Sequence, residues 1–94
     1  MDAGITVQLA LVNARAPLRA LADVTLQCSS GQITIRRCAV FQKTGEPPWA
    51  NLPRLPIDKG GKKVFVPLVD LPRGLKQRVL DAVLSEYRSK SDAR

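Results

Sequence analysis

The chain has no histidine, only two cysteines and only four aromatic side chains among its 94 residues. Without histidine it lacks the side chain best suited to proton transfer and metal binding near neutral pH. Two cysteines alone make a poor zinc site, and neither has a histidine to activate it as a nucleophile. The sequence Gly60-Gly61-Lys62 lacks the glycine spacing and the Ser or Thr of a phosphate-binding loop. We therefore expect no enzymatic activity, no cofactor and no metal site.

Long apolar runs are also missing. No run approaches the roughly 20 apolar residues that a membrane-spanning helix needs. The first four residues lack the basic start and apolar stretch of a signal peptide. We therefore expect a cytoplasmic protein with no membrane partner. The length allows one domain with a modest core, which dimerisation would help to cover.

Acidic residues are scarce beside basic ones. Eight Asp and Glu stand against fifteen Lys and Arg, which gives a formal net charge of +7. The excess lies mainly in residues 43–78, where eight basic and three acidic groups give +5, whereas residues 79–94 carry three of each. A basic balance of this size favours polyanionic partners. Binding is therefore favoured over catalysis.

Alternating apolar and polar residues predict a β-hairpin from Leu18–Gln27 and Gln32–Phe41, joined by a four-residue loop over residues 28–31. In this register the numbers of facing residues sum to 59, so that Val24 meets Ile35 on the apolar face. The pairing brings chemically similar side chains together along the hairpin. It therefore fixes an expected register for the centre of the sheet.

The same register makes predictions for the charged residues and cysteines of the hairpin. Asp23 faces Arg36, which gives that arginine a structural role, whereas Arg37 falls on the apolar face without an explanation. Cys38 lies opposite Leu21, roughly 20 Å along the strand from the other cysteine, in the turn. A disulfide needs Cα atoms within about 7 Å, so this register excludes one.

Residues 5–12 alternate in the same way and predict a strand with one buried face. Asn13 to Pro17 would turn this strand into the hairpin. Both observations predict a sheet that grows by antiparallel neighbours. The expected buried face of the strand consists of Ile5, Val7, Leu9 and Leu11.

The middle of the chain is rich in turn residues. Trp49–Leu52 lies between prolines and predicts an edge strand or an ordered loop. Asp58 to Gly61 is a turn signal, and Lys62–Leu68 after it predicts a further strand. In that strand one face is expected to hold Val64, Val66 and Leu68, and the other Phe65.

The period changes near the C-terminus. From Leu75 onward apolar residues recur at three and four positions, which predicts an amphipathic helix over about residues 72–90. Asp70 can accept backbone N–H bonds at the helix start, and Pro72 is tolerated in the first turn. We therefore expect one α+β domain over residues 1–94, with a small antiparallel sheet of about four to five strands in hairpins and this C-terminal helix. Its apolar stripe is Leu75, Val79, Leu80, Ala82, Val83, Leu84 and Tyr87.

Basic residues crowd the start of this helix, where the peptide dipoles already present their positive pole. Each exposed cation there is unfavourable by about 0.3–1 kcal/mol. A phosphate site would explain them, because free N–H groups and cations both favour an anion. The alternatives are solvated side chains and, for Lys62 and Lys63, protection of a sheet edge against aggregation. The predicted nucleic-acid-binding residues are Lys43, Arg54, Lys59, Lys62, Lys63, Arg73, Lys76 and Arg78.

The few aromatic residues are expected mainly in structural roles. Phe41 and Phe65 alternate with core positions, so packing is favoured over base stacking. Trp49 follows Pro48 in the basic stretch and can stack on an unpaired base. Capping the core or a dimer seam is the favoured alternative for this tryptophan.

Four segments of the sequence occur in an order that is typical of one family. They are Val7–Val12, Leu18–Leu26, Ile33–Val40 and the ending Val79–Tyr87. Together they resemble the SpoVG family, stage V sporulation protein G, also called septation protein, over nearly the whole chain. The resemblance implies a small α+β homodimer that binds DNA and RNA and affects transcription regulation and division-septum formation.

Residue by residue the resemblance is narrower. Leu52-Pro53-Arg54 matches a Leu/Met-Pro stretch of the family with its nearby basic residue, and Arg73 matches the basic residue at the helix start. Pro67 is retained, whereas Val66 stands where the family has a histidine. The segment Lys43–Trp49 departs from the glycine-rich turn of the family.

We therefore expect a dimeric, non-enzymatic regulator that binds DNA or RNA through phosphate contacts and affects gene expression, cell division and sporulation. The alternative is a protein-interaction adaptor of the cell-division machinery, whose basic surface meets an acidic protein. In the second case the partners are division or regulatory proteins.

Overall fold

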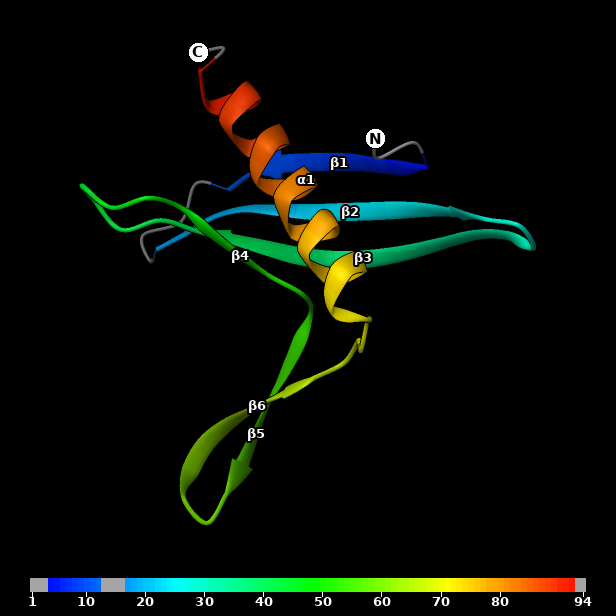
Figure 1. Cartoon of the computed structure of the whole chain (residues 1–94). Helices are drawn as coiled ribbons and strands as arrows, with labels where there is room; N and C mark the ends of the chain where they lie inside the picture. Colours follow the sequence, from blue (N-terminus) through cyan, green and yellow to red (C-terminus); the bar gives the residue numbers. More distant parts are fainter. Residues whose placement is uncertain (1–3, 13–16, 93–94) are drawn as a thin grey trace.

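The computed structural model describes residues 4–12 and 17–92, and it has the expected α+β fold (Figure 1). Four strands form an antiparallel sheet in the order β1-β2-β3-β4, and two more form a separate hairpin. Of the predicted turn from Asn13 to Pro17, residues 13–16 lie outside the described residues. The elements are β1 (Ile5–Leu11), β2 (Leu18–Cys28), β3 (Gly31–Phe41), β4 (Trp49–Asn51), β5 (Arg54–Lys59), β6 (Lys62–Pro67) and α1 (Arg73–Asp92).

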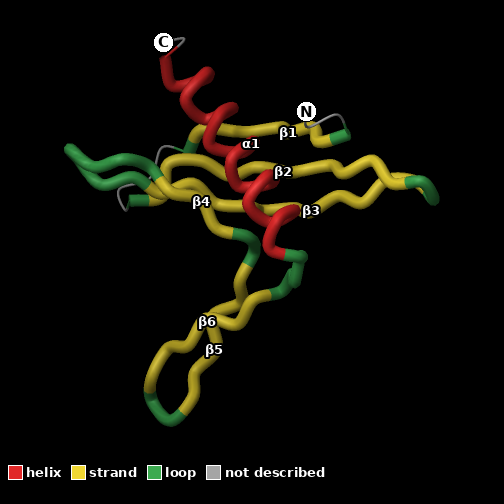
Figure 2. Tube along the Cα trace, in the orientation of Figure 1, coloured by secondary structure: helices red, strands yellow, loops and turns green. Residues whose placement is uncertain are grey.

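The core lies between one face of the sheet and α1, which crosses that face diagonally (Figure 2). Alternate residues of β1 and β2 face the helix, as their apolar alternation predicts. The opposite face of the sheet is covered by no element within the described chain (Figure 1). The buried side chains are Leu9, Ala20, Ala22, Val24, Leu26, Ile35, Cys38, Val40, Ala50, Leu52, Val79, Val83 and Tyr87.

The predicted hairpin register is confirmed from the turn to the middle of the strands. Val24 pairs with Ile35, and Thr25 pairs with Thr34, whose hydroxyl groups lie 3.2 Å apart. The loop is shorter than expected, because Cys28 already pairs with Gly31 and leaves a two-residue turn. Trp49 also forms the expected edge strand, β4, beside β3.

From Ala22 to Ala20 the predicted register is wrong by one residue, and a second shift restores it where Leu18 pairs with Phe41. Cys38 pairs with Ala22 instead of Leu21, because β3 carries a bulge opposite Asp23. Arg37 occupies the bulge with a φ of 66°. The extra residue leaves Arg37 exposed and lets Cys38 face the core, where it is fully buried. The charged residue expected on the apolar face is therefore not there.

The helix begins at Arg73 and ends at Asp92, close to the predicted bounds. Its first hydrogen bond runs from the Lys76 N–H to the Pro72 carbonyl at 2.8 Å, which makes Pro72 the N-cap residue. The predicted capping role of Asp70 is wrong, because none of the described N–H groups bonds its exposed side chain. Proline has no side-chain acceptor, so the first N–H groups of the helix have no side-chain cap.

The β5–β6 hairpin projects away from the sheet (Figure 1). Every residue of both strands is exposed, and the two glycines of the turn adopt φ values of 60° and 83°. Of the predicted buried face, Val64 is 41% and Val66 38% exposed, and Phe65 on the other face is 53% exposed. The core positions expected here are therefore wrong, because alternation shows which residues share a face and not whether the face is covered.

The projecting hairpin lowers the compactness of the molecule. The radius of gyration is 14.2 Å, against about 12 Å for a compact domain of this length. No helix in the described part of the chain combines the length and apolarity needed to cross a membrane.

Candidate nucleic-acid interface

The tip of the hairpin gathers three of the predicted basic residues. Lys59 pairs directly with Lys62 across the strands, and Lys63 pairs with Asp58. Like charges in directly opposite positions are destabilising, because their Cβ atoms lie about 4.5–5.5 Å apart. None of the three lysines forms an ion pair within the described residues. The tip therefore carries an uncompensated positive charge that an anion would relieve.

The helix start carries the second group of basic residues. Arg73 and Lys76 are exposed in the first turn and lie about 60° apart around the helix. Arg78 lies about 160° from Lys76, on the other side of the helix, and it already has an interaction partner. The helix therefore brings Arg73 and Lys76 together and directs Arg78 elsewhere.

The predicted site residues do not form one patch. The base of the hairpin lies near the start of α1. Its tip lies a full hairpin length away from that helix start (Figure 1). A strand of six residues spans roughly 20 Å. Arg54 lies at the hairpin base, at the start of β5. The loop between β3 and β4, which holds Lys43, extends from a different end of the sheet.

Aromatic side chains and arginines meet where the uncovered face of the sheet joins the hairpin base. Phe41 and Trp49 stack across β3 and β4 with ring centroids 5.7 Å apart and planes at 21°. The guanidinium of Arg54 lies 5.0 Å from the ring centroid of Phe65. A hollow of about 140 Å³ lies between these groups. Its lining is Arg37, Ala39, Phe41, Asn51, Leu52, Pro53, Arg54 and Phe65.

Sequence reasoning missed most of this junction. The sequence favours packing over base stacking for Phe65, and it offers no explanation of Arg37. The one indication in the sequence is the position of Arg37 on the predicted apolar face, since burying an unpaired arginine there would be costly. With the amide of Asn51 oriented to satisfy both of its ends, its oxygen accepts a bond from Arg54 at 3.2 Å.

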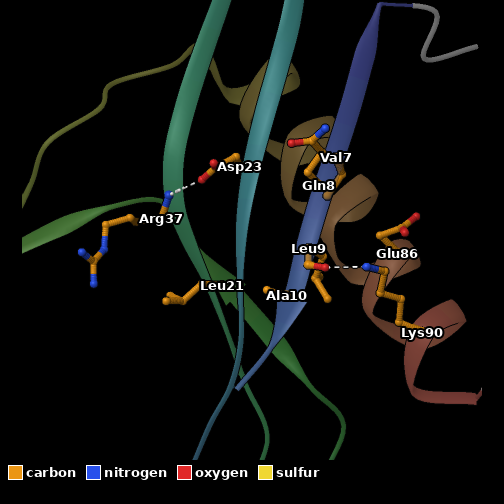
Figure 3. Close-up of a pocket in the computed structure, with 9 residues that line it drawn as sticks. All are labelled: Val7, Gln8, Leu9, Ala10, Leu21, Asp23, Arg37, Glu86 and Lys90. Carbon is orange, nitrogen blue, oxygen red and sulfur yellow. Dashed lines mark hydrogen bonds between the residues drawn. The ribbon is translucent and has the colours of Figure 1, made fainter. Parts of the chain in front are cut away.

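A larger groove, of about 640 Å³, is lined by residues of β1 and α1 and also by Leu21, Asp23 and Arg37 of β2 and β3 (Figure 3). The Lys90 ammonium donates a 2.6 Å hydrogen bond to the Leu9 carbonyl across the outer edge of β1, and Glu86 lies next to it on the helix. An adjoining hollow of about 430 Å³ is lined by Ile5, Val7, Asp81, Ala82, Ser85 and Glu86. Along this edge β1 therefore contributes the apolar side chains of Ile5 and Val7, and α1 contributes the acidic side chains of Asp81 and Glu86.

The buried Cys38 is not placed for nucleophilic chemistry. Burial raises the pKa of the Cys38 thiol from 9.0 to about 11, and the nearby Asp23 carboxylate adds to the effect. With this raised pKa the Cys38 thiol stays protonated at neutral pH. Since the thiolate is the reactive form of cysteine, the protonated thiol is a poor nucleophile. Cys28 is a free, exposed cysteine in the strand end beside the turn.

In comparisons with known proteins, no protein-family model, no curated protein and no solved structure matches this chain. The resemblance to the SpoVG family stays a prediction from the sequence. A function must therefore be argued from the charge and geometry of the described residues.

Proposed function

We propose that this protein is a cytoplasmic, homodimeric, non-enzymatic regulator that binds DNA or RNA and affects gene expression and septation or sporulation, as the resemblance to SpoVG implies. The observation that carries the proposal is the directly opposed pair Lys59 and Lys62 at the tip of an exposed hairpin. Directly opposed like charges destabilise a hairpin, and a bound anion would offset that cost.

Two further features support phosphate binding. The N–H groups at the start of α1 have no side-chain cap, and Arg73 and Lys76 lie beside them. Helix starts with nearby cations favour an anion. The hairpin tip and the helix start are separated by roughly the length of β5, so a nucleic-acid strand can contact both through phosphates several nucleotides apart. Such contacts give affinity and carry little sequence information.

A binding titration tests the proposal. Labelled single-stranded DNA, duplex DNA and RNA of matched length are each titrated with the protein at low salt, and fluorescence anisotropy is measured. We expect binding to at least one of the three that weakens steeply as salt is added. Absence of binding to all three at 50 mM salt would reject nucleic-acid binding.

The homodimer has structural support in the hairpin. An isolated two-stranded hairpin is marginally stable in water, and this one exposes apolar side chains along the part of one face nearest its base. A second copy of the chain can cover that face and raise the stability of both hairpins. The apolar part of this face consists of Leu55, Ile57, Val64 and Val66, and Lys59 and Lys62 continue the same face at the tip.

The protein-interaction adaptor remains the second candidate, and the edge of β1 favours it. Val12 and Gly4 bond to β2 through their backbones, so Ile5 and Val7 point their backbone groups outward, whereas the outward carbonyl of Leu9 already accepts a bond from Lys90. An extended peptide can add to such an edge. Asp81 and Glu86 above the edge suit a basic peptide, which reverses the charge expected from the sequence.

Replacing Val7 by proline removes one outward N–H and leaves the β1–β2 bonds in place. The adaptor function predicts that a peptide of alternating valine and lysine binds the native protein and loses affinity for V7P. Nucleic-acid binding would be unchanged in this variant. Equal peptide binding by both proteins would reject the edge as a docking site.

A further inference from the structure

The residues that line the hollow at the hairpin base suit a planar ligand that has negatively charged groups on either side. Two of its walls are the rings of Phe41 and Phe65, and two are the side chains of Arg37 and Arg54. Phe65 is 53% exposed and does not belong to the core. An exposed phenylalanine between arginines offers a stacking surface together with positive charge.

The bulge in β3 is what brings Arg37 to this hollow. Without the extra residue, the period of two would place Arg37 on the face that α1 covers. The bulge is fixed by Asp23, which accepts a 3.2 Å bond from the Arg37 backbone N–H. Bulges of this kind re-aim a side chain. Figure 3 shows the Arg37 side chain directed away from β2 and toward β4.

Arg54 lies over the ring of Phe65 on another wall of the hollow. Its guanidinium lies 5.0 Å from the Phe65 ring centroid and within 3.2 Å of the Asn51 amide oxygen. A planar guanidinium fixed on a ring extends the stacking surface. The amide of Asn51 adds a donor and acceptor at the rim.

We propose that this hollow binds an unpaired nucleobase of single-stranded DNA or RNA. The inference rests on the proposed nucleic-acid binding and names its ligand class. The base stacks on the ring surface formed by Phe65 and Phe41, while Arg37 and Arg54 neutralise the phosphates on either side. A base of a duplex must first be unpaired and unstacked, which costs free energy that an unpaired base does not pay. Single strands are therefore preferred over duplexes.

An abasic oligonucleotide separates stacking from charge, because it keeps every phosphate and removes the bases. Oligothymidine, oligouridine, the abasic strand and a duplex are each titrated with the full-length protein, and anisotropy gives the affinities. We expect the native protein to bind oligothymidine or oligouridine about tenfold more tightly than the abasic strand. The two base-bearing strands distinguish a DNA from an RNA ligand.

Two variants remove the planar surface while keeping the hydrophobicity or the charge. Phe65→Leu and Arg54→Lys are both expected to bind the base-bearing strands only as tightly as the abasic strand. Arg88→Lys, an exposed cation on α1, is the matched control and should bind like the native protein. Circular dichroism verifies that each variant is folded, and the two variants test the hollow at independent positions.

The outcomes are distinguishable. Equal binding of base-bearing and abasic strands by the native protein overturns the base site and leaves phosphate binding intact. Variants that keep the native preference for bases overturn it as well. If the native protein binds none of the four probes, the proposed nucleic-acid function fails, and the base site fails with it.

Discussion

At the scale of single residues, Asp23 holds the bulge of β3 with both carboxylate oxygens. It accepts a 3.0 Å bond from the Arg36 guanidinium and a 3.2 Å bond from the Arg37 backbone N–H. We expect Asp23→Ala to lower the free energy of unfolding by about 1 kcal/mol, because both bonds are partly exposed to water. Arg36→Ala removes only the exposed ion pair and should cost less. Denaturant unfolding measures both, and equal costs would contradict a role for Asp23 in the bulge.

Cys38 predicts a pH dependence of stability. Burial raises the folded pKa from 9.0 to about 11, so the unfolded thiol ionises first as pH rises. Its contribution to stability is complete below pH 9 and is lost as pH rises toward 11. At pH 10 the loss is about 1 kcal/mol. Denaturant unfolding at pH 7 and pH 10 measures how much free energy of unfolding is lost as pH rises. We expect Cys38→Ala to lose less than the native protein, and identical losses in the two proteins would contradict the role of Cys38.

At the scale of elements, the start of α1 can be tested by charge reversal. Arg73→Glu together with Lys76→Glu should abolish nucleic-acid binding and leave the fold intact, because acidic side chains suit a helix start. Electrophoretic mobility shift measures the binding. Lys90 is unsuitable as a control because its ammonium bonds the Leu9 carbonyl.

Arg88→Glu is the better control, since Arg88 is exposed near the far end of the helix. The matched comparison is between single reversals, Lys76→Glu and Arg88→Glu. If both weaken binding equally, the interaction is a diffuse charge effect and the helix start is not a site.

Alternation allowed the prediction of β1, β2, β3 and the helix, because each has one buried face with a clear period. β5 could not be predicted, since Arg54-Leu55-Pro56 contains a proline and neither face is buried. The bulge at Arg37 could not be predicted either, because the extra residue leaves the alternation of apolar and polar residues before it unchanged. For the same reason the junction of Phe65 with Arg54 could not be found, because it depends on how the hairpin leaves the sheet.

At the scale of the whole molecule, the uncovered hairpin predicts a dimer. Light scattering at micromolar concentration should give twice the mass of the chain. Ile57→Asp with Val64→Asp places charges on the exposed apolar face and should yield a monomer, because buried unpaired carboxylates are costly. Thr34→Asp, on the uncovered sheet face, is the control and should remain dimeric. A monomeric native protein would contradict the dimer.

The most direct test of nucleic-acid binding is its salt dependence at the hairpin tip. The affinity for labelled single-stranded DNA is measured by anisotropy between 50 and 200 mM salt, for the native protein and for Lys59→Gln with Lys62→Gln. Each phosphate contact contributes about 0.7 to the slope of log affinity against log salt on a single strand. The account predicts that the double substitution lowers the slope by about 1.4, whereas Arg88→Gln leaves it unchanged. A slope that the tip substitutions do not alter would contradict the account.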